Sequence, residues 1–184
     1  MANDPRYIAF LRGINVGGNK LIKMEALAAA FTAAGFRKVK TYIASGNVIF
    51  ESKAAKVASM EKKAEKQLLE TFGHEITVVI FSLADLEALL KHDIFKRVRS
   101  GAEAMLLVTF LKDEIKNLKL PLESEKENLK VIAVNDRAAF TVARRKKTGW
   151  FGFPNNFIEK ELGIAATTRQ WRTVEKVVAV ARAL

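Results

Sequence analysis

The sequence predicts an α+β fold made of two linked ferredoxin-like halves with antiparallel sheets. Two observations predict it. Strand-like and helix-like apolar periodicities follow one another in the order β-α-β-β-α-β up to residue 81. A looser β-α-β-β-α order then follows in the rest of the chain. We therefore expect an N-terminal half over residues 1–81 and a C-terminal half with a terminal helix over residues 82–184.

In the N-terminal half, residues 7–11 form a short apolar strand, and a helix from Met24 is closed by Gly35. Ser45-Gly46-Asn47 then separates two short strands and predicts a hairpin turn. The remaining predicted elements are a helix over residues 53–72 that ends at Gly73 and a β-branched strand over residues 75–81.

In the C-terminal half, Ser82 can cap the first helix together with Asp85. Thr173 is the expected N-cap of the last helix, and Gly163 closes the helix before it. The other predicted elements are strands over residues 104–111, 129–134 and 138–143, a short helix around residues 113–118, and helices over residues 157–162 and 173–184.

Positive charge is concentrated at the two ends of the chain. The net charge is +11, with 7 Lys and Arg against 2 Asp and Glu in residues 1–50, 13 against 14 in residues 51–127, and 11 against 4 in residues 128–184. Clustered cations attract anions because their fields add. The alternative is that the charge only keeps the protein soluble.

Several kinds of chemistry find no support in the sequence. There is no cysteine, so disulfides and thiolate metal sites are excluded, and a reducing compartment is expected. His74 and His92 are 18 residues apart, without the spacing of a metal site or of a serine–histidine pair. We expect no metal and no cofactor. No signal peptide and no membrane-spanning run is visible, so we expect a cytoplasmic protein.

A glycine-rich loop after the first strand is the first candidate site. Its glycines, Gly17 and Gly18, let backbone N–H groups face an anion, and Arg12, Lys20 and Lys23 supply positive charge. The spacing is not that of a nucleotide-binding P-loop, because Asn19 separates Gly18 from the lysine. The alternative is a loop that only connects two elements.

Two candidate sites lie in the C-terminal half. Residues 144–147 are four consecutive cations followed by the aromatic stretch 150–153, a combination that suits a single-stranded nucleic acid. We favour the alternative that these aromatic residues fold back onto the core. Arg169 and Trp171 precede the last helix and suit an anion site, although Trp171 could equally be a core anchor.

Residues 7–18, 23–24 and 41–50, an N-terminal signature, resemble those of an uncharacterised, mostly bacterial family catalogued as domain of unknown function 1697. Residues 167–174, a C-terminal signature, are similar to its second conserved stretch, although Gln170 and Arg172 stand where the family more often carries asparagine. The resemblance implies two linked ferredoxin-like halves and no known reaction. With the charge distribution, it leads us to expect one ligand-binding groove. Its predicted residues are Arg12, Asn15, Gly17, Gly18, Lys20, Lys23, Ser45, Asn47, Arg169 and Trp171.

Three functions remain open. The first is binding of an anionic, phosphate-containing ligand, a nucleotide or a nucleic acid, in a basic groove. The second is an enzyme acting on a small phosphorylated or carboxylated metabolite, for which the sequence identifies no catalytic base. The third is an oligomerising scaffold that uses exposed strand edges. The oligomeric state is not predicted.

Overall fold

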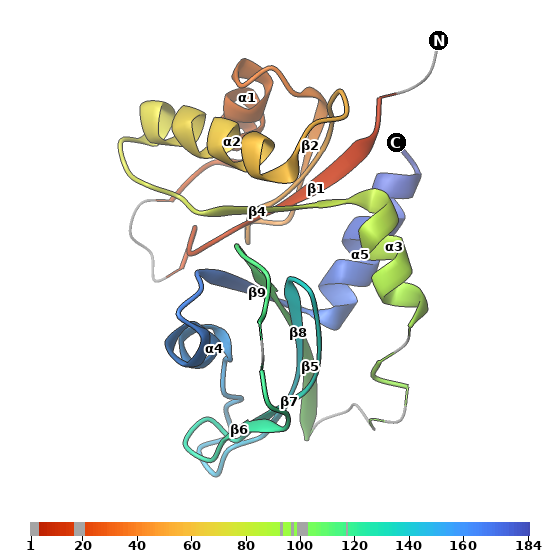
Figure 1. Ribbon diagram of the computed structural model, residues 1–184. Helices are drawn as coiled ribbons and strands as arrows, with labels where there is room; N and C mark the ends of the chain where they lie inside the picture. Colours follow the sequence, from red (N-terminus) through yellow and green to blue (C-terminus); the bar gives the residue numbers. More distant parts are fainter. Residues whose placement is uncertain (1–3, 17–20, 93, 97, 99–102, 117) are drawn as a thin grey trace. The chain divides into compact units, whose positions relative to one another are not determined.

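The computed structural model describes residues 4–16, 21–92, 94–96, 98, 103–116 and 118–184. The chain divides into two units, one of Met1–Lys91 with Lys176–Leu184 and one of His92–Glu175. Each unit has its own antiparallel sheet (Figure 1). None of the helices in the described part of the chain is long and apolar enough to cross a lipid bilayer.

The first unit has the ferredoxin-like arrangement that the sequence predicts. Its four strands lie in the order β2-β3-β1-β4, and every neighbouring pair is antiparallel. Helices α1 and α2 cover one face of this sheet (Figure 1). The elements are β1 (Arg6–Leu11), α1 (Met24–Ala33), β2 (Arg37–Tyr42), β3 (Asn47–Glu51), α2 (Val57–Phe72), β4 (Val78–Ser82) and α3 (Leu83–Lys91).

Local sequence explains where these helices end and begin. Gly73 ends α2 with a left-handed φ of 73°, which glycine adopts without a steric penalty. Ser82 starts α3 as predicted, because its Oγ accepts the N–H of Asp85 at 3.0 Å and donates to the Asp85 carboxylate at 2.6 Å.

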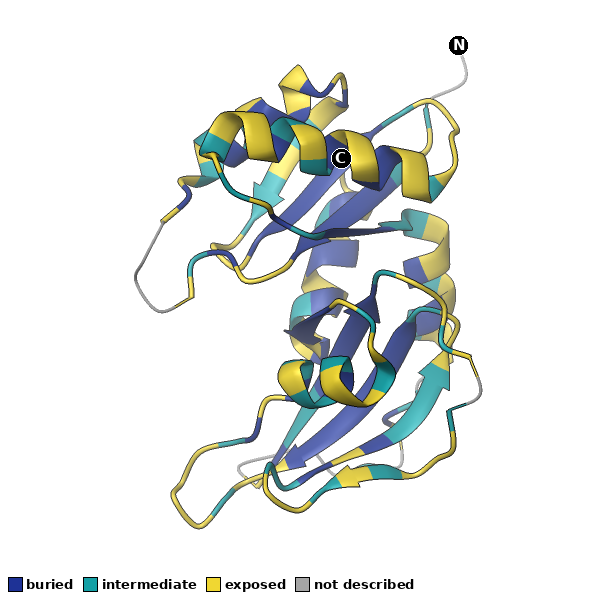
Figure 2. Ribbon diagram, turned by 60° about the vertical axis from the view of Figure 1, so that its left-hand side comes forward, coloured by how far each residue is buried: buried dark blue, intermediate teal, exposed yellow. Residues whose placement is uncertain are grey.

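The core of the first unit lies between the sheet and helices α1 and α2. Alternate strand residues face these helices, and aromatic rings fill the centre, with the centroids of Phe36 and Phe50 4.4 Å apart. Central strands of this sheet are buried (Figure 2). Ile8 and Ile49, which alternate with the residues that face the helices, have no exposed surface either.

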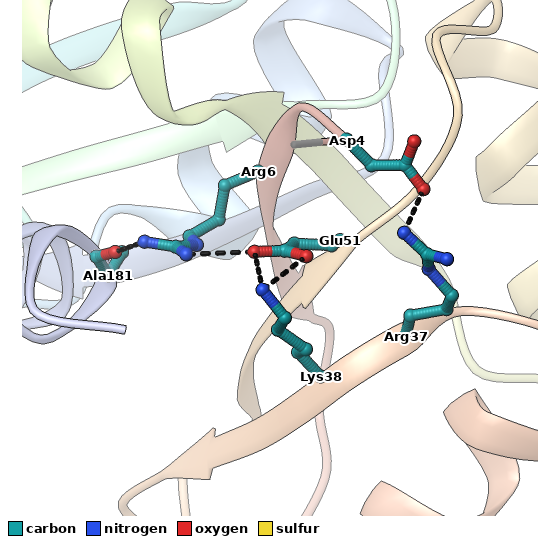
Figure 3. A network of polar contacts seen from close by, with 6 residues as sticks. All are labelled: Asp4, Arg6, Arg37, Lys38, Glu51 and Ala181. Atoms are coloured by element: carbon teal, nitrogen blue, oxygen red, sulfur yellow. Dashed lines mark hydrogen bonds and ion pairs between the residues drawn. The ribbon is translucent and has the colours of Figure 1, made fainter. Parts of the chain in front are cut away.

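An ionic network lies at the end of β3 in the first unit (Figure 3). The buried carboxylate of Glu51 accepts from Arg6 at 2.8 Å and from Lys38 at 3.1 Å, and Arg6 also donates to the carbonyl of Ala181 in α5. Lys38 has a φ of 46° at a register shift of β2, which turns its side chain toward Glu51. Mainly the hydrogen bond from Arg6 lowers the pKa of Glu51 below its ordinary value.

Two carboxylates of α2 accept hydrogen bonds from backbone N–H groups of the edge strand β4. Glu65 Oε1 accepts the N–H of Val78 at 2.9 Å, and Glu61 Oε1 accepts the N–H of Ile80 at 2.8 Å. Unpaired edge amides would otherwise invite another strand to add to the sheet. These side chains therefore protect β4 from pairing with a second chain.

The second unit has a five-stranded antiparallel sheet in the order β6-β7-β8-β5-β9. The last four of these strands repeat the arrangement of the first sheet. Its elements are β5 (Ala104–Leu111), β6 (Leu122–Ser124), β7 (Leu129–Asn135), β8 (Ala138–Arg144), α4 (Asn155–Leu162), β9 (Ala166–Gln170) and the first turn of α5 (Trp171–Arg182). Helix α4 packs Ile158 against Leu111 and Val131 of this sheet.

Two predictions for the C-terminal half are wrong. The predicted helix at residues 113–118 is irregular in its described part, because the N–H of Ile115 donates to the carbonyl of Asp136 at 2.6 Å instead of forming a helical bond. Thr173 is not an N-cap, since α5 already begins at Trp171. Residues 166–170, for which we predicted neither a helix nor a strand, form β9, in which β-branched Thr167 and Thr168 pair with β5.

Candidate functional site

The glycine loop and the hairpin turn of the N-terminal signature lie at one end of the first sheet. The N–H of Leu11 donates to the carbonyl of Gly46, and the N–H of Arg12 donates to the carbonyl of Thr77, both at 2.9 Å. Three connections therefore meet here, namely β1–α1, β2–β3 and α2–β4. The fold brings the two parts of this signature together.

Asn15 joins these connections through its side-chain amide. Its Nδ2 donates to the carbonyls of Ile22 at 3.1 Å and Ala44 at 2.9 Å, and its Oδ1 accepts the N–H of Ile22 at 2.7 Å. Its φ of 56° lies in the left-handed region, where asparagine is tolerated better than most residues. The amide of Asn15 thus fixes the shape of the loop.

The Ser45-Gly46-Asn47 segment ends the β2–β3 turn and packs against the glycine loop. A Cβ at Gly46 would lie 2.6 Å from Cδ1 of Ile14, and the φ of Gly46 is +81°. Asn47 is buried and donates from Nδ2 to the carbonyl of Tyr42 at 2.9 Å and to Oγ of Ser45 at 3.1 Å. Glycine at this position allows the two parts of the signature to touch.

The described cations of this loop are on the surface. Arg12 and Lys23 are exposed, as is Ser45. Lys23 is the N-cap residue of α1 and makes no side-chain capping bond, so the first amides of this helix have no side-chain cap from that position. Gly17, Gly18 and Lys20, which we predicted as ligand-binding residues, lie outside the described residues.

Arg169, predicted as a surface anion receptor, is buried in β9. Only 7% of it is exposed, and its Nη1 donates to Oγ1 of Thr167 at 2.8 Å and to the carbonyl of Thr168 at 2.9 Å. Burial lowers the pKa of Arg169 to about 10, so the guanidinium remains charged at neutral pH. Arg169 therefore places a charge beneath the surface of the second unit.

Trp171 is a core residue that also reaches a pocket. It is 7% exposed, and its ring packs edge-on against Phe95 and Phe140 with centroid distances of 5.2 and 6.2 Å. The alternative that Trp171 is a core anchor is thus correct for most of the surface of this side chain.

A pocket of about 540 Å³ in the second unit contains the exposed part of the C-terminal signature. This volume is within the range that holds small-molecule ligands. Apolar groups and the polar side chains at the start of α5 both line it. The lining residues are Ala104, Met105, Leu106, Phe151, Gln170, Trp171, Arg172 and Glu175.

Of these lining residues, the sequence-based site contained only Trp171. Gln170 and Arg172 were noted as signature residues, but they were not assigned to the site. Because the predicted helix began at Thr173 and no strand was predicted before it, the sequence did not indicate that Arg172 lies in the first helical turn after a strand. Phe151 and the end of β5 reach the pocket only through tertiary structure, which no local pattern reveals.

We expected the aromatic residues of the basic and aromatic segment 144–153 to fold back onto the core, and two of them do not. Trp150 is 78% exposed and Phe153 is 55% exposed, so that interpretation is wrong for both. Phe151 alone packs inward, against a cluster of Leu107, Leu129 and Ala143.

The described residues contain no group of three histidine or acidic side chains placed to hold a metal ion. The Nδ1 atom of His74 lies 3.0 Å from the carbonyl of Phe72, at the end of α2. The predicted residues that the structure describes thus form two sets, one around Asn15 in the first unit and one around Trp171 in the second. The common groove of Arg12 and Arg169 stays a prediction, because these arginines belong to different units.

Comparison with known proteins agrees with this architecture. The family described as protein of unknown function (DUF1697) matches residues 5–140. No curated protein matches the chain. A solved structure, that of the conserved bacterial protein SP0830 from Streptococcus pneumoniae, is similar with a TM-score of 0.68 and 22% sequence identity, over 96% of this chain and 98% of that one. This likeness shows the fold. The chain belongs to the DUF1697 family, whose activity is unknown.

Proposed function

We propose that the protein binds an anionic, phosphate-containing ligand, a nucleotide or a nucleic acid, in the pocket at the start of α5. The observation that carries this proposal is the composition of the pocket. The C-terminal signature contributes a guanidinium, an amide and an aromatic ring, and the basic and aromatic segment 144–153 contributes Phe151. A charged group beside an apolar surface suits a ligand with a phosphate and a flat base.

The chemistry of each side of the pocket supports this assignment. Arg172 can form two parallel hydrogen bonds with a phosphate, and the first N–H groups of α5 favour negative charge. Met105, Leu106 and Phe151 offer an apolar wall for a base. Glu175, the carboxylate among the lining residues, disfavours an anion next to it and suits the hydroxyl groups of a sugar.

The N-terminal signature forms a second part of the proposal. Arg12 and Lys23 are exposed beside the glycine loop, and the α1 N-terminus lacks a side-chain cap from Lys23. We keep Asn15, Gly17, Gly18, Lys20, Ser45 and Asn47 in this predicted anion-binding region, with Asn15 and Asn47 shaping its loops. A cytoplasmic location is part of the same proposal.

A thermal-shift screen of nucleotides, short RNA and DNA, and phosphorylated metabolites at two salt concentrations tests the proposal, because a ligand that binds only the folded protein raises Tm. Arg172→Gln should weaken binding of the best ligand roughly 10- to 100-fold, since a hydrogen bond to a charged group is lost. Lys176→Gln removes an exposed cation one turn further along α5 and is the matched control. An equal loss of affinity in both variants, or a screen in which no compound raises Tm, would contradict the proposal.

An enzyme acting on a small phosphorylated metabolite is the second candidate, and Glu175 is the observation that favours it. The carboxylate lies in the same pocket as Arg172 and could serve as a general base. In that case Glu175→Gln would retain the ligand and abolish its conversion. Retained conversion would remove Glu175 from any catalytic role.

The scaffold alternative is the least supported of the three. The amides of Val78 and Ile80 on the edge of β4 are bound by α2 carboxylates, so this edge does not offer a free ladder to a second chain. Analytical ultracentrifugation over a wide concentration range tests it. Assembly that grows with concentration, without any response to ligands, would favour the scaffold.

A further inference from the structure

The basic and aromatic segment in the second unit forms a defined hairpin. The N–H of Lys146 donates to the carbonyl of Trp150 at 2.8 Å, and the N–H of Gly149 donates to the carbonyl of Lys146 at 2.9 Å. Gly149 has a φ of +85°, as expected for a three-residue hairpin loop with a glycine at its last position. Lys147 and Thr148 therefore occupy the tip, and Lys146 and Trp150 face each other at its base.

The hairpin is anchored to the segment between β6 and β7. The N–H of Arg144 donates to the carbonyl of Asn128 at 2.8 Å, and Nδ2 of Asn128 donates to the carbonyl of Arg145 at 3.1 Å. A Cβ at Gly152 would lie 1.9 Å from the backbone oxygen of Glu127, so the two backbones approach as closely as glycine allows. The exposed aromatic residues thus stand on a supported element.

The two faces of this hairpin differ. Arg145 and Phe151 form a bridge pair, and the Arg145 guanidinium carbon lies 5.3 Å from the centre of the Phe151 ring. Since side chains alternate along a strand, Lys146 and Trp150 are on the other face. There Trp150 is 78% exposed, although a large apolar side chain is usually buried in a folded protein.

Positive charge predominates in the stretch of chain that carries this indole, since residues 144–147 are all cationic and residues 148–158 contain no acidic side chain. Arg145 lies 3.7 Å from Glu103, and Lys146 lies 2.8 Å from Glu127, so two of the four consecutive cations face carboxylates. Arg144 and Lys147 are exposed on either side of that pair along the chain. Negative charge together with a flat apolar surface on a partner would complement these exposed groups.

We propose that this hairpin is a contact element for single-stranded nucleic acid, with a base stacked on Trp150 and phosphates next to Arg144 and Lys147. Exposed aromatic rings flanked by cations bind single strands in this way, because every base has a π face and every linkage has a charge. The inference rests on the proposed function and narrows its ligand class. Trp150 and Phe153 do not line the 540 Å³ pocket, so they suit a polymer that extends beyond it.

Fluorescence anisotropy with labelled single-stranded oligonucleotides, DNA and RNA, tests this inference on the full chain. Trp150→Ala should weaken binding about 5- to 100-fold, as the loss of one stacked base does, and Trp150→Phe should weaken it less. Lys147→Gln should make the negative slope of log affinity against log salt shallower by about 0.7, the value for one phosphate of a single strand. The matched controls are Leu69→Ala, an exposed apolar residue of α2, and Lys66→Gln, an exposed cation of the same helix, and both should bind as the wild type.

The same variants separate this inference from the proposed function. If Trp150→Ala binds the oligonucleotide as tightly as the wild type, or if the wild type does not bind it at low salt, the hairpin inference is overturned. Equal affinity for a duplex, with no effect of Trp150→Ala, also overturns it. In each case, mononucleotide binding that depends on Arg172 would leave the pocket proposal intact. Loss of oligonucleotide binding in Trp150→Ala, with mononucleotide binding unchanged, is the result that we expect.

Discussion

At the scale of single residues, several polar side chains of the two signatures shape the fold. Asn15 uses its amide within the loop, and Asn47 is buried under the β2–β3 turn. Arg169 is likewise buried, whereas Arg12, Lys23 and Arg172 remain exposed. Side chains of both signatures can therefore serve the fold itself.

For Asn15, the structure predicts a measurable loss of stability on truncation. Asn15→Ala removes three hydrogen bonds and places alanine at a left-handed φ, so it should lower the free energy of unfolding by about 1–3 kcal/mol. Asn15→Gly removes the same bonds without the backbone strain and should be less severe. Urea denaturation measures both. A change of less than about 0.5 kcal/mol in Asn15→Ala would show that these bonds matter little.

For Glu51, the structure predicts a pH dependence. Its pKa is lowered in the folded state from an ordinary value of 4.5, so its contribution to stability is present above that value and is lost as the pH falls through the folded pKa. Glu51→Gln should therefore be less stable at pH 7, and its deficit in Tm should shrink as the pH falls below 4.5. Glu70→Gln, at an exposed position of α2, is the control. A deficit that stays constant down to pH 3 would contradict this assignment.

At the scale of elements, the sequence predicts strands and helices well where apolar periodicity and caps agree. Strand β5 has the predicted bounds, and Gly73 and Gly163 end their helices as expected. Strand β9 was missed because the polar run 167–170 has no apolar alternation and becomes a strand only by pairing with β5. The pocket could not be predicted for a related reason, since β5, the hairpin and α5 meet there only in the folded chain.

The contact between the glycine loop and the β2–β3 turn can be tested as a coupling. Gly46→Ala should destabilise the protein, both because its φ is +81° and because the new Cβ meets Ile14. Ile14→Val removes Cδ1, the closest atom, and should relieve part of that cost. A double-mutant cycle measured by chemical denaturation reports the coupling directly. Strict additivity of the two changes would argue against the close contact.

At the scale of the whole molecule, the chain has two units, each with its own antiparallel sheet. It passes from one unit to the other between residues 91 and 92 and returns between residues 175 and 176. Helix α5 contributes its first residues to the second unit and the rest to the first. The positive excess of the sequence, +5 in residues 1–50 and +7 in residues 128–184, lies in the same parts of the chain as the two signatures. This distribution predicts that ligand affinity falls steeply with salt.

The most direct test of the central claim, a phosphate-containing ligand held beside Trp171, follows the emission of that indole. In Trp150→Phe, Trp171 is the remaining tryptophan of the chain and lines the pocket. Titration with the nucleotide found in the screen should change its emission saturably, and the additional change Arg172→Gln should shift the midpoint roughly 10- to 100-fold. Nucleotide binding measured by calorimetry that leaves Trp171 emission unchanged would place the ligand elsewhere and contradict the claim.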